Sequence, residues 1–169
     1  MKNKMSIVKY FLVIVTFALL QSSFFPQFQI MQTRPDLILL FVISIGLLKG
    51  SREGAVTGAG AGIIAGIISW NVWGLYFLVY SLAGFFAGFI PEKVEPDIFI
   101  VPLLSGLVGS VGMALIFSVL GPSLDLFYPT GDDLIRTLIF TGWNGFFSIP
   151  VFWVSRYVLI SPDATWSLK

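Results

Sequence analysis

Few side chains in this sequence are of the types that carry out chemistry. The chain contains no histidine and no cysteine, which excludes disulfides, thiol nucleophiles, histidine-based acid–base catalysis and most zinc sites. The phosphate-binding P-loop, the metalloprotease motif HExxH and the hydrolase motif GxSxG are all missing. The nine acidic residues flank apolar runs instead of converging on one pocket, so a pair of catalytic carboxylates is not expected. We therefore predict a protein that is not an enzyme and that needs no metal and no cofactor.

The stretch MQTRPDLILLF, residues 31–41, places two opposite charges around a proline in front of an apolar run. Pro35 suits the first turn of a helix, where its missing N–H removes no hydrogen bond. Asp36 faces the positive end of the helix dipole, and Arg34 lies just outside as a possible partner of that carboxylate. A helix cap alone needs no arginine. Two interpretations therefore stay open: a plain helix cap, or a cap that also contacts a partner protein.

Asn144, in TGWNGFF, is the one strongly polar side chain well inside a predicted span. It either hydrogen-bonds between helices or lines a small cavity. Arg136 follows Asp132 and Asp133 by four and three residues, which is the spacing of ion pairs on a helix. Because charged side chains stay near the predicted helix ends, an ion-driven transporter is disfavoured.

Glycines recur at every fourth position in GAVTGAGAGIIAG, at Gly54, Gly58, Gly62 and Gly66. On a helix they form a ridge without side chains, which another backbone can approach closely. Small residues recur in the later spans as well; they are Ser81, Gly84, Gly88, Ser105, Gly109 and Gly112. The ridge serves either the internal packing of a bundle or the docking of a partner's transmembrane helix. The ridge and the corner at 34–36 are our candidate contact regions for a partner.

The composition indicates an integral membrane protein. Of the 169 residues, 56% are hydrophobic and 11% are charged, and the mean hydropathy is +0.90; a soluble domain carries roughly 25% charged residues. The net charge of +1 gives no basic field for nucleic acid. Breaks in the apolar pattern predict an all-α protein, a single compact bundle of six transmembrane helices. The predicted spans are 6–25, 35–48, 54–70, 75–90, 98–120 and 134–159.

The distribution of basic residues predicts the orientation. With the N-terminus in the cytoplasm, eight of the ten Lys and Arg residues fall on the cytoplasmic side, and both termini are cytoplasmic. The first apolar stretch is too long for a signal peptide and is expected to be a retained span. The second span reaches only about 21 Å, against roughly 30 Å of hydrocarbon. It begins earlier, thins the bilayer or is shielded by its neighbours; these alternatives stay open.

Three motifs resemble the rod shape-determining protein MreD family of bacterial inner-membrane proteins. RPDLILLFVISIGLLKG is similar to the family's second span, which is rich in Pro, Asp and Leu and ends in a basic residue and glycine. GAVTGAGAGIIAG resembles its glycine-spaced third span, and WGLYFLVYSLAGFFAG its fourth. Many members carry an aspartate after the glycine series, where this chain has GIISWNVWGL. The length and the six-helix layout also fit.

The resemblance implies a non-enzymatic scaffold of the cell-elongation machinery in the inner membrane. Such a protein would bind the single-span protein MreC. It would thereby link MreB filaments to peptidoglycan synthesis by RodA and a class B penicillin-binding protein. The family also resembles the six-helix substrate-binding components of energy-coupling-factor transporters. That likeness supplies an alternative, a membrane component that binds a small molecule in a polar pocket open to the outside.

Overall fold

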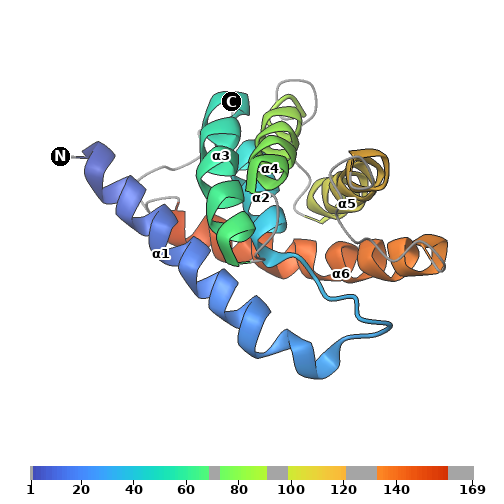
Figure 1. Ribbon diagram of the computed structural model, residues 1–169. Coiled ribbons are helices and arrows are strands. Elements are labelled where there is room, and N and C mark those ends of the chain that lie inside the picture. The colour runs from blue at the N-terminus through green and yellow to red at the C-terminus, as the bar shows by residue number, and fades with distance from the viewer. Residues whose placement is uncertain (1, 69–72, 91–98, 121–132, 160–169) are drawn as a thin grey trace.

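The computed structural model describes residues 2–68, 73–90, 99–120 and 133–159 (Figure 1). In these ranges the chain forms α-helices, one short 3-10 helix and no β-strand. The elements are α1 (Lys2–Ser23), η1 (Phe25–Phe28), α2 (Leu37–Lys49), α3 (Ser51–Ile68), α4 (Trp73–Ala87), α5 (Ile100–Leu120) and α6 (Asp133–Leu159). The prediction of an all-α protein with six helices is confirmed.

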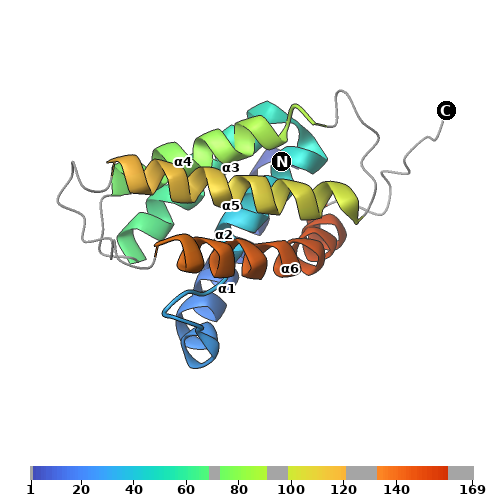
Figure 2. The ribbon, with the colours of Figure 1, turned by 90° about the vertical axis from the view of Figure 1, so that its right-hand side faces the viewer.

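Helix α2 lies at the centre of the molecule. Figure 2 shows it between α3, α4 and α5 on one side and α1 and α6 on the other. Every residue from Leu37 to Leu47 is buried. A helix of 13 residues reaches about 20 Å, which is short for a helix that faces lipid. Of the three explanations left open for this short span, the burial favours shielding by the neighbouring helices.

Glycine ends α2 and starts the next helix. Gly50 has a φ of 91° and its N–H donates to the carbonyl of Gly46 at 2.8 Å. A positive φ is easy for glycine because it has no Cβ, and here it forms the helix C-cap. Since α3 begins at Ser51, a single residue reverses the chain. The turn brings α3 and then α4 back alongside α2 (Figure 1).

Helix α1 contacts α2 over part of its length. Lys49 of α2 lies over the ring of Tyr10 in α1, 5.2 Å from its centroid, and Phe41 meets the ring of Phe17 edge-on at 5.8 Å. Helix α1 otherwise diverges from the bundle (Figure 1). Pro150 lies inside α6, where it removes a backbone hydrogen bond and favours a kink; the C-terminal part of α6 turns away from the first part in Figure 2.

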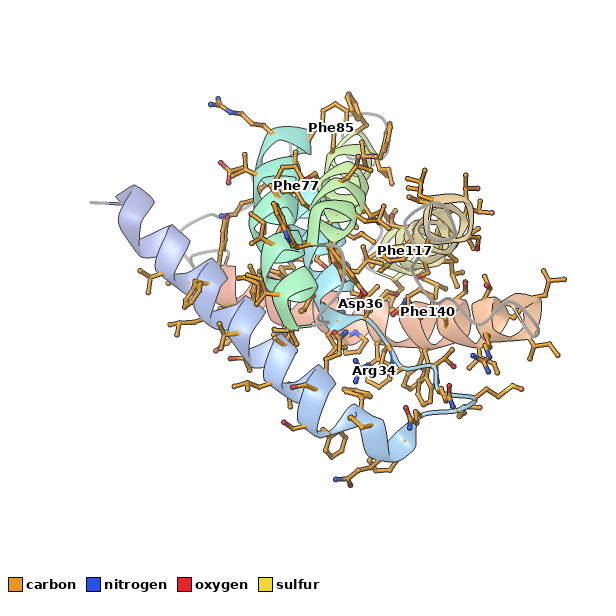
Figure 3. All side chains as sticks on the ribbon, viewed as in Figure 1. Arg34, Asp36, Phe77, Phe85, Phe117 and Phe140 are labelled. Carbon is orange, nitrogen blue, oxygen red and sulfur yellow. The ribbon has the colours of Figure 1, made fainter. Side chains whose placement is uncertain are left out.

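Length and composition support a membrane location for part of this bundle. Within the described residues, two helices are long and apolar enough to cross a membrane, Ile100–Leu120 and Leu134–Val158. Three more are apolar but shorter: Val8–Ser23, Leu37–Lys49 and Trp73–Ala87. Large apolar side chains project from the outer helix faces (Figure 3), and Val108 and Phe146 are 70% and 71% exposed. Such a surface is unfavourable in water and suits lipid. Six complete spans and the position of the termini stay predictions.

Candidate functional site

The start of α2 is a buried polar site. Asp36 is the N-cap residue, and its Oδ1 accepts a hydrogen bond from the N–H of Leu39 at 3.0 Å. Only 5% of Asp36 is exposed. The first N–H groups of a helix have no partner inside the helix, and a capping aspartate supplies one. The carboxylate also lies at the positive end of the helix dipole, so the local backbone favours a negative charge here.

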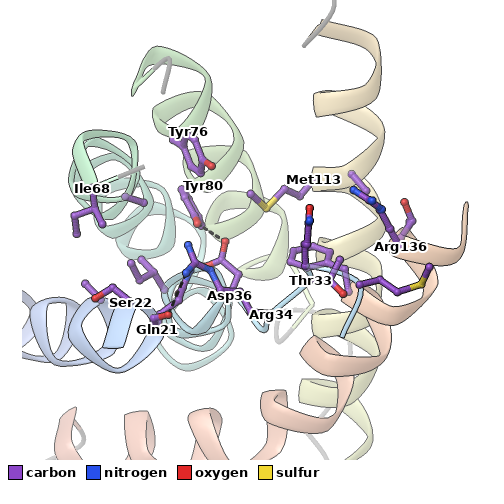
Figure 4. A pocket seen from close by; sticks show the side chains of 18 of the residues that line it. Gln21, Ser22, Thr33, Arg34, Asp36, Ile68, Tyr76, Tyr80, Met113 and Arg136 are labelled. Carbon is purple, nitrogen blue, oxygen red and sulfur yellow. Dashed lines mark hydrogen bonds between the residues drawn. The ribbon is translucent and has the colours of Figure 1, made fainter. Parts of the chain in front are cut away.

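Three other helices complete the site. From α4, the hydroxyl of Tyr80 donates to Oδ2 of Asp36. From α6, Oδ1 of Asn144 accepts the N–H of Asp36 at 2.7 Å. From α1, Oε1 of Gln21 accepts the N–H of Leu37 at 3.1 Å. Figure 4 shows Tyr80 and Asp36 joined, with Gln21 on the side of α1. We name this set the α2 cap site: Gln21, Asp36, Tyr80 and Asn144.

The α2 cap site joins residues that the sequence had singled out separately. Asp36 caps α2, and Asn144, 108 residues away, forms a hydrogen bond between helices. Arg34 behaves differently from the expectation. Its Nη1 donates to the carbonyl of Gln21 at 3.5 Å, while Tyr80 is the side-chain donor to the Asp36 carboxylate. Pro35, directly before the cap, is fully buried. The charge of Arg34 still acts on the Asp36 carboxylate, so the sequence predicted this electrostatic partner and missed the hydrogen-bond donor Tyr80.

Sequence reasoning missed Tyr80 and Gln21. Tyr80 is 1% exposed, and a buried tyrosine hydroxyl needs a hydrogen-bond partner. Its position inside an apolar run of the fourth span was a usable signal. Gln21 lies near the end of the first span, where a polar residue is ordinary, so its sequence context carried no signal. Which helix each would meet depends on the tertiary packing.

Some buried polar atoms of α5 and α6 have no hydrogen-bond partner among the described residues. They are Nδ2 of Asn144, Nε of Arg136, Oγ1 of Thr141, Nε1 of Trp143 and Oγ of Ser105. Unpaired buried donors are costly, and each is an exception in a folded protein. Four of the five belong to α6. This helix therefore has the most buried polar atoms that could still form a hydrogen bond. The side chains of Asp132 and Asp133, the predicted ion partners of Arg136, lie outside the described residues.

A cavity of about 390 Å³ adjoins the α2 cap site. Residues from every α-helix line it, including Gln21, Arg34, Asp36, Tyr76, Tyr80, Met113, Ser118, Arg136 and Phe140. Figure 4 shows Arg34 near Gln21 and Arg136 on the other side of the cavity. The cavity combines aromatic walls with cationic groups, which is the lining of a site for a small molecule or headgroup.

The glycine ridge is in contact with α4 and not with the outside. A Cβ at Gly54 or Gly58 would overlap the carbonyl of Gly84 or Tyr80, and one at Gly62 would lie 2.5 Å from the carbonyl oxygen of Tyr76. We name this contact the α3–α4 seam. Of the two roles left open for the ridge, the structure shows internal packing: α4 covers these glycines, and they do not form a lipid-facing surface for a partner helix.

The remaining glycines of the pattern belong to the same seam. A Cβ at Gly66 would lie 2.5 Å from Cα of Trp73, and Cβ atoms at Gly84 and Gly88 would overlap the backbone of Gly54 and Ser51. The glycines of α3 therefore lie against the backbone of α4, and Gly84 and Gly88 remove side chains on the α4 side at one end of the contact, as in small-residue contacts between membrane helices. The alternation of glycine on two helices explains the regular spacing seen in the sequence.

The small residues of α5 do not form a second seam. Between α4 and α5 lies an apolar groove of about 670 Å³, lined in part by Ser105, Gly109 and Gly112. A Cβ at Gly109 would meet the side chain of Ile43, 2.5 Å from its Cδ1, while one at Gly112 would meet nothing within 4 Å. Small residues on one helix alone thus leave open space instead of a close contact.

The turn before α2 has an unusual backbone. Met31 and Gln32 both have positive φ, 49° and 63°, which is the pattern of a type I′ turn and is normally filled by Asn and Gly. The N–H of Thr33 donates to the carbonyl of Ile30 at 2.9 Å, and the N–H of Ile30 to the carbonyl of Thr33 at 3.2 Å. Met31 and Arg34 are exposed. Strain of this kind in residues with side chains persists where the surroundings or a function maintain it.

Comparison with known proteins identifies one family that the chain matches. The family model described as rod shape-determining protein MreD matches residues 3–159. Curated proteins give no match, and solved structures give none either, so the expected likeness to energy-coupling-factor components gains no support from known structures. The match spans all six helices, from the α2 cap site to the α3–α4 seam. The chain therefore belongs to the MreD family of rod shape-determining membrane proteins.

Proposed function

We propose that this chain is a non-enzymatic scaffold of the cell-elongation machinery in the bacterial inner membrane. In this role it binds the single-span protein MreC and so links MreB filaments to peptidoglycan synthesis by RodA and a class B penicillin-binding protein. The family match over residues 3–159 is the observation that carries the proposal. Both termini are cytoplasmic in this proposal, as the distribution of basic residues favours, and the start of α2 then faces the outside of the membrane.

The contact with MreC involves the turn at residues 30–34 rather than the glycine ridge. The ridge is occupied by α4. The turn, in contrast, presents Ile30 and Met31, 51% and 44% exposed, on a strained backbone with a cationic Arg34 beside it. Exposed apolar side chains on a strained, hydrogen-bonded turn are the kind of surface that a protein partner covers. The proposed contact thus includes the corner at 34–36, as the sequence suggested, and adds the residues of the turn before it.

The test is a double substitution that removes the side chains and keeps the turn. Met31→Asn with Gln32→Gly supplies the residues that a type I′ turn prefers, so the backbone becomes less strained while the exposed methionine is lost. We expect membrane insertion and thermal stability in detergent to be maintained and co-purification with MreC to fall several-fold. Val111→Asn, at an apolar position on α5 with a similar exposure of 40%, is the control and should leave co-purification unchanged.

Normal co-purification of the double variant would reject the turn as the contact and leave the scaffold proposal standing. Failure of the unaltered chain to retain MreC would reject the scaffold proposal itself. The two parts of the proposal are thus tested by different measurements.

A second candidate is a membrane component that binds a small molecule, as in an energy-coupling-factor transporter. The cavity of about 390 Å³ beside the α2 cap site favours it, since that function requires a polar pocket open to the outside. A gene position beside ATPase subunits, together with a ligand that stays bound through purification, would support this candidate. A position beside the genes for MreB and MreC supports the scaffold.

A further inference from the structure

The cavity beside the α2 cap site is polar in a way that the rest of the bundle is not. Of the ten basic residues in the chain, Arg34 and Arg136 line this one cavity. Asp36 is the acidic residue in its lining. A cationic excess of this kind attracts an anion, and the surrounding apolar walls strengthen the attraction by excluding water.

Both oxygens of the Asp36 carboxylate in the cavity are already engaged. Oδ1 of Asp36 accepts from the N–H of Leu39, and Oδ2 accepts from Tyr80. The Asp36 carboxylate therefore serves the helix start and the tyrosine, and it is a poor partner for a second cation.

The guanidinium donors, in contrast, are underused. Nε of Arg136 is buried and has no hydrogen-bond partner among the described residues, although a guanidinium carries five N–H donors. Arg34 makes one long contact, 3.5 Å, with the carbonyl of Gln21. A guanidinium fork fits the oxygens of a phosphate or carboxylate in pairs. The unpaired Nε of Arg136 and the weakly engaged Arg34 are suited to an anionic oxygen group.

The walls near Arg136 suit an apolar extension of the same molecule. Met113 and Ala114 of α5, Phe140 of α6 and Tyr76 of α4 line the same cavity as Arg136. The volume of about 390 Å³ lies in the range of small-molecule pockets. It accommodates a charged group with a short organic part, while a whole lipid would have to extend its chains between the helices.

We propose that this cavity binds a phosphate group esterified to a small organic or lipid moiety, with Arg136 holding the phosphate oxygens. The apolar side of the molecule lies against Met113 and Phe140. The source of the phosphate is either an anionic phospholipid from the surrounding leaflet or a soluble phosphate ester. The inference does not depend on the scaffold function and adds a ligand site to the chain.

The experiment uses the full-length protein purified in a maltoside detergent, which contains no phosphate. Phosphatidylglycerol and glycerol phosphate are titrated separately, and binding is followed by the shift in Tm and by native mass spectrometry. Arg136→Gln removes the charge at the cavity. Arg156→Gln is the matched control, since Arg156 is also half-buried in α6 but does not line the cavity.

We expect saturable binding of at least one probe and a loss of about tenfold or more in affinity for Arg136→Gln, with Arg156→Gln unchanged. Binding of both probes identifies the phosphate group as sufficient, and binding of phosphatidylglycerol alone identifies the lipid as the source. Arg136→Lys keeps the charge without the fork and should bind with intermediate affinity, which separates ligand contact from a folding defect. Absence of saturable binding, or equal losses in Arg136→Gln and Arg156→Gln, would overturn the proposal.

Discussion

Where α3 meets α4, glycine removes the side chains and the two backbones touch; where α2 begins, side chains from α1, α4 and α6 reach across to the backbone and cap of α2. The α3–α4 seam gains its stability from dispersion over a close contact. The α2 cap site gains it from hydrogen bonds between buried groups. The seam is therefore sensitive to any atom that is added, and the cap site to any atom that is removed.

The two regions also differ in how far apart in the sequence their residues lie. All the seam residues lie between Ser51 and Gly88, and only four residues separate Ile68 of α3 from Trp73 of α4 along the chain. The cap site spans Gln21 to Asn144 and forms only when four helices have assembled. We infer that the seam can form early and locally, while the cap site reports the completed bundle.

The largest effect is expected for Gly58→Leu at the seam. The new side chain would overlap the carbonyl of Tyr80, so α3 and α4 must separate. The cost is expected to exceed about 3 kcal/mol of the free energy of unfolding, above the usual range for an overpacked core because backbone atoms are in the way. Equilibrium unfolding in mixed micelles measures it. Gly60→Leu, two residues away and with nothing within 4 Å of its Cβ, should cost little; equal losses at both positions would contradict the seam.

The next effect is expected for Asp36→Ala at the cap site. The change removes the helix cap and leaves the Tyr80 hydroxyl and the Leu39 N–H without their acceptor. We expect a loss of about 2–4 kcal/mol in the free energy of unfolding. Asp36→Asn keeps the side-chain acceptor and should lose much less. An unchanged stability in the same unfolding experiment for Asp36→Ala would show that the cap site does not hold the bundle.

A smaller effect is expected for Asn144→Leu. The branched shape is the same, with two methyl groups in place of the amide oxygen and nitrogen, but the N–H of Asp36 loses its acceptor and becomes an unpaired buried donor. We expect a loss of about 1–2 kcal/mol, partly offset because the unpaired Nδ2 of Asn144 is removed as well. Ser155→Ala is the control, since Ser155 is equally buried in α6 and bonds only to its own helix, at the carbonyl of Val151. A similar loss in both variants would count against a special role of Asn144.

The smallest effect is expected for Tyr80→Phe. It removes one hydroxyl and leaves the ring and the other bonds of Asp36 in place. Hydrogen bonds between membrane helices are worth about 1 kcal/mol, and we expect a loss of this size in thermal or denaturant unfolding. Tyr157→Phe, on the exposed side of α6, should have no effect. If Tyr80→Phe also has none, the tyrosine hydroxyl is not what anchors Asp36.

Much of the fold follows from patterns that are local in the sequence. Apolar runs broken by Pro, Gly and charges predict the six helices, because each run has the length and composition of one element. The capping role of Asp36 follows from its place after Pro35 and before an apolar run. The partner of Asp36 does not follow, because Arg34 was the nearest opposite charge in sequence and Tyr80, 44 residues away, is the nearest donor in space.

The sequence by itself determined the helical class, the apolar surface and the positions at which side chains are missing or polar. Those properties depend on residue type and spacing, which can be read directly from the sequence. Only the tertiary structure decided what each special position meets: the ridge meets α4 and not a partner, Asn144 meets the start of α2, and Arg136 faces a cavity with an unused donor. The reason is physical. A glycine ridge or a buried amide fixes how closely a neighbour can approach, but which helix becomes that neighbour depends on the packing of all six.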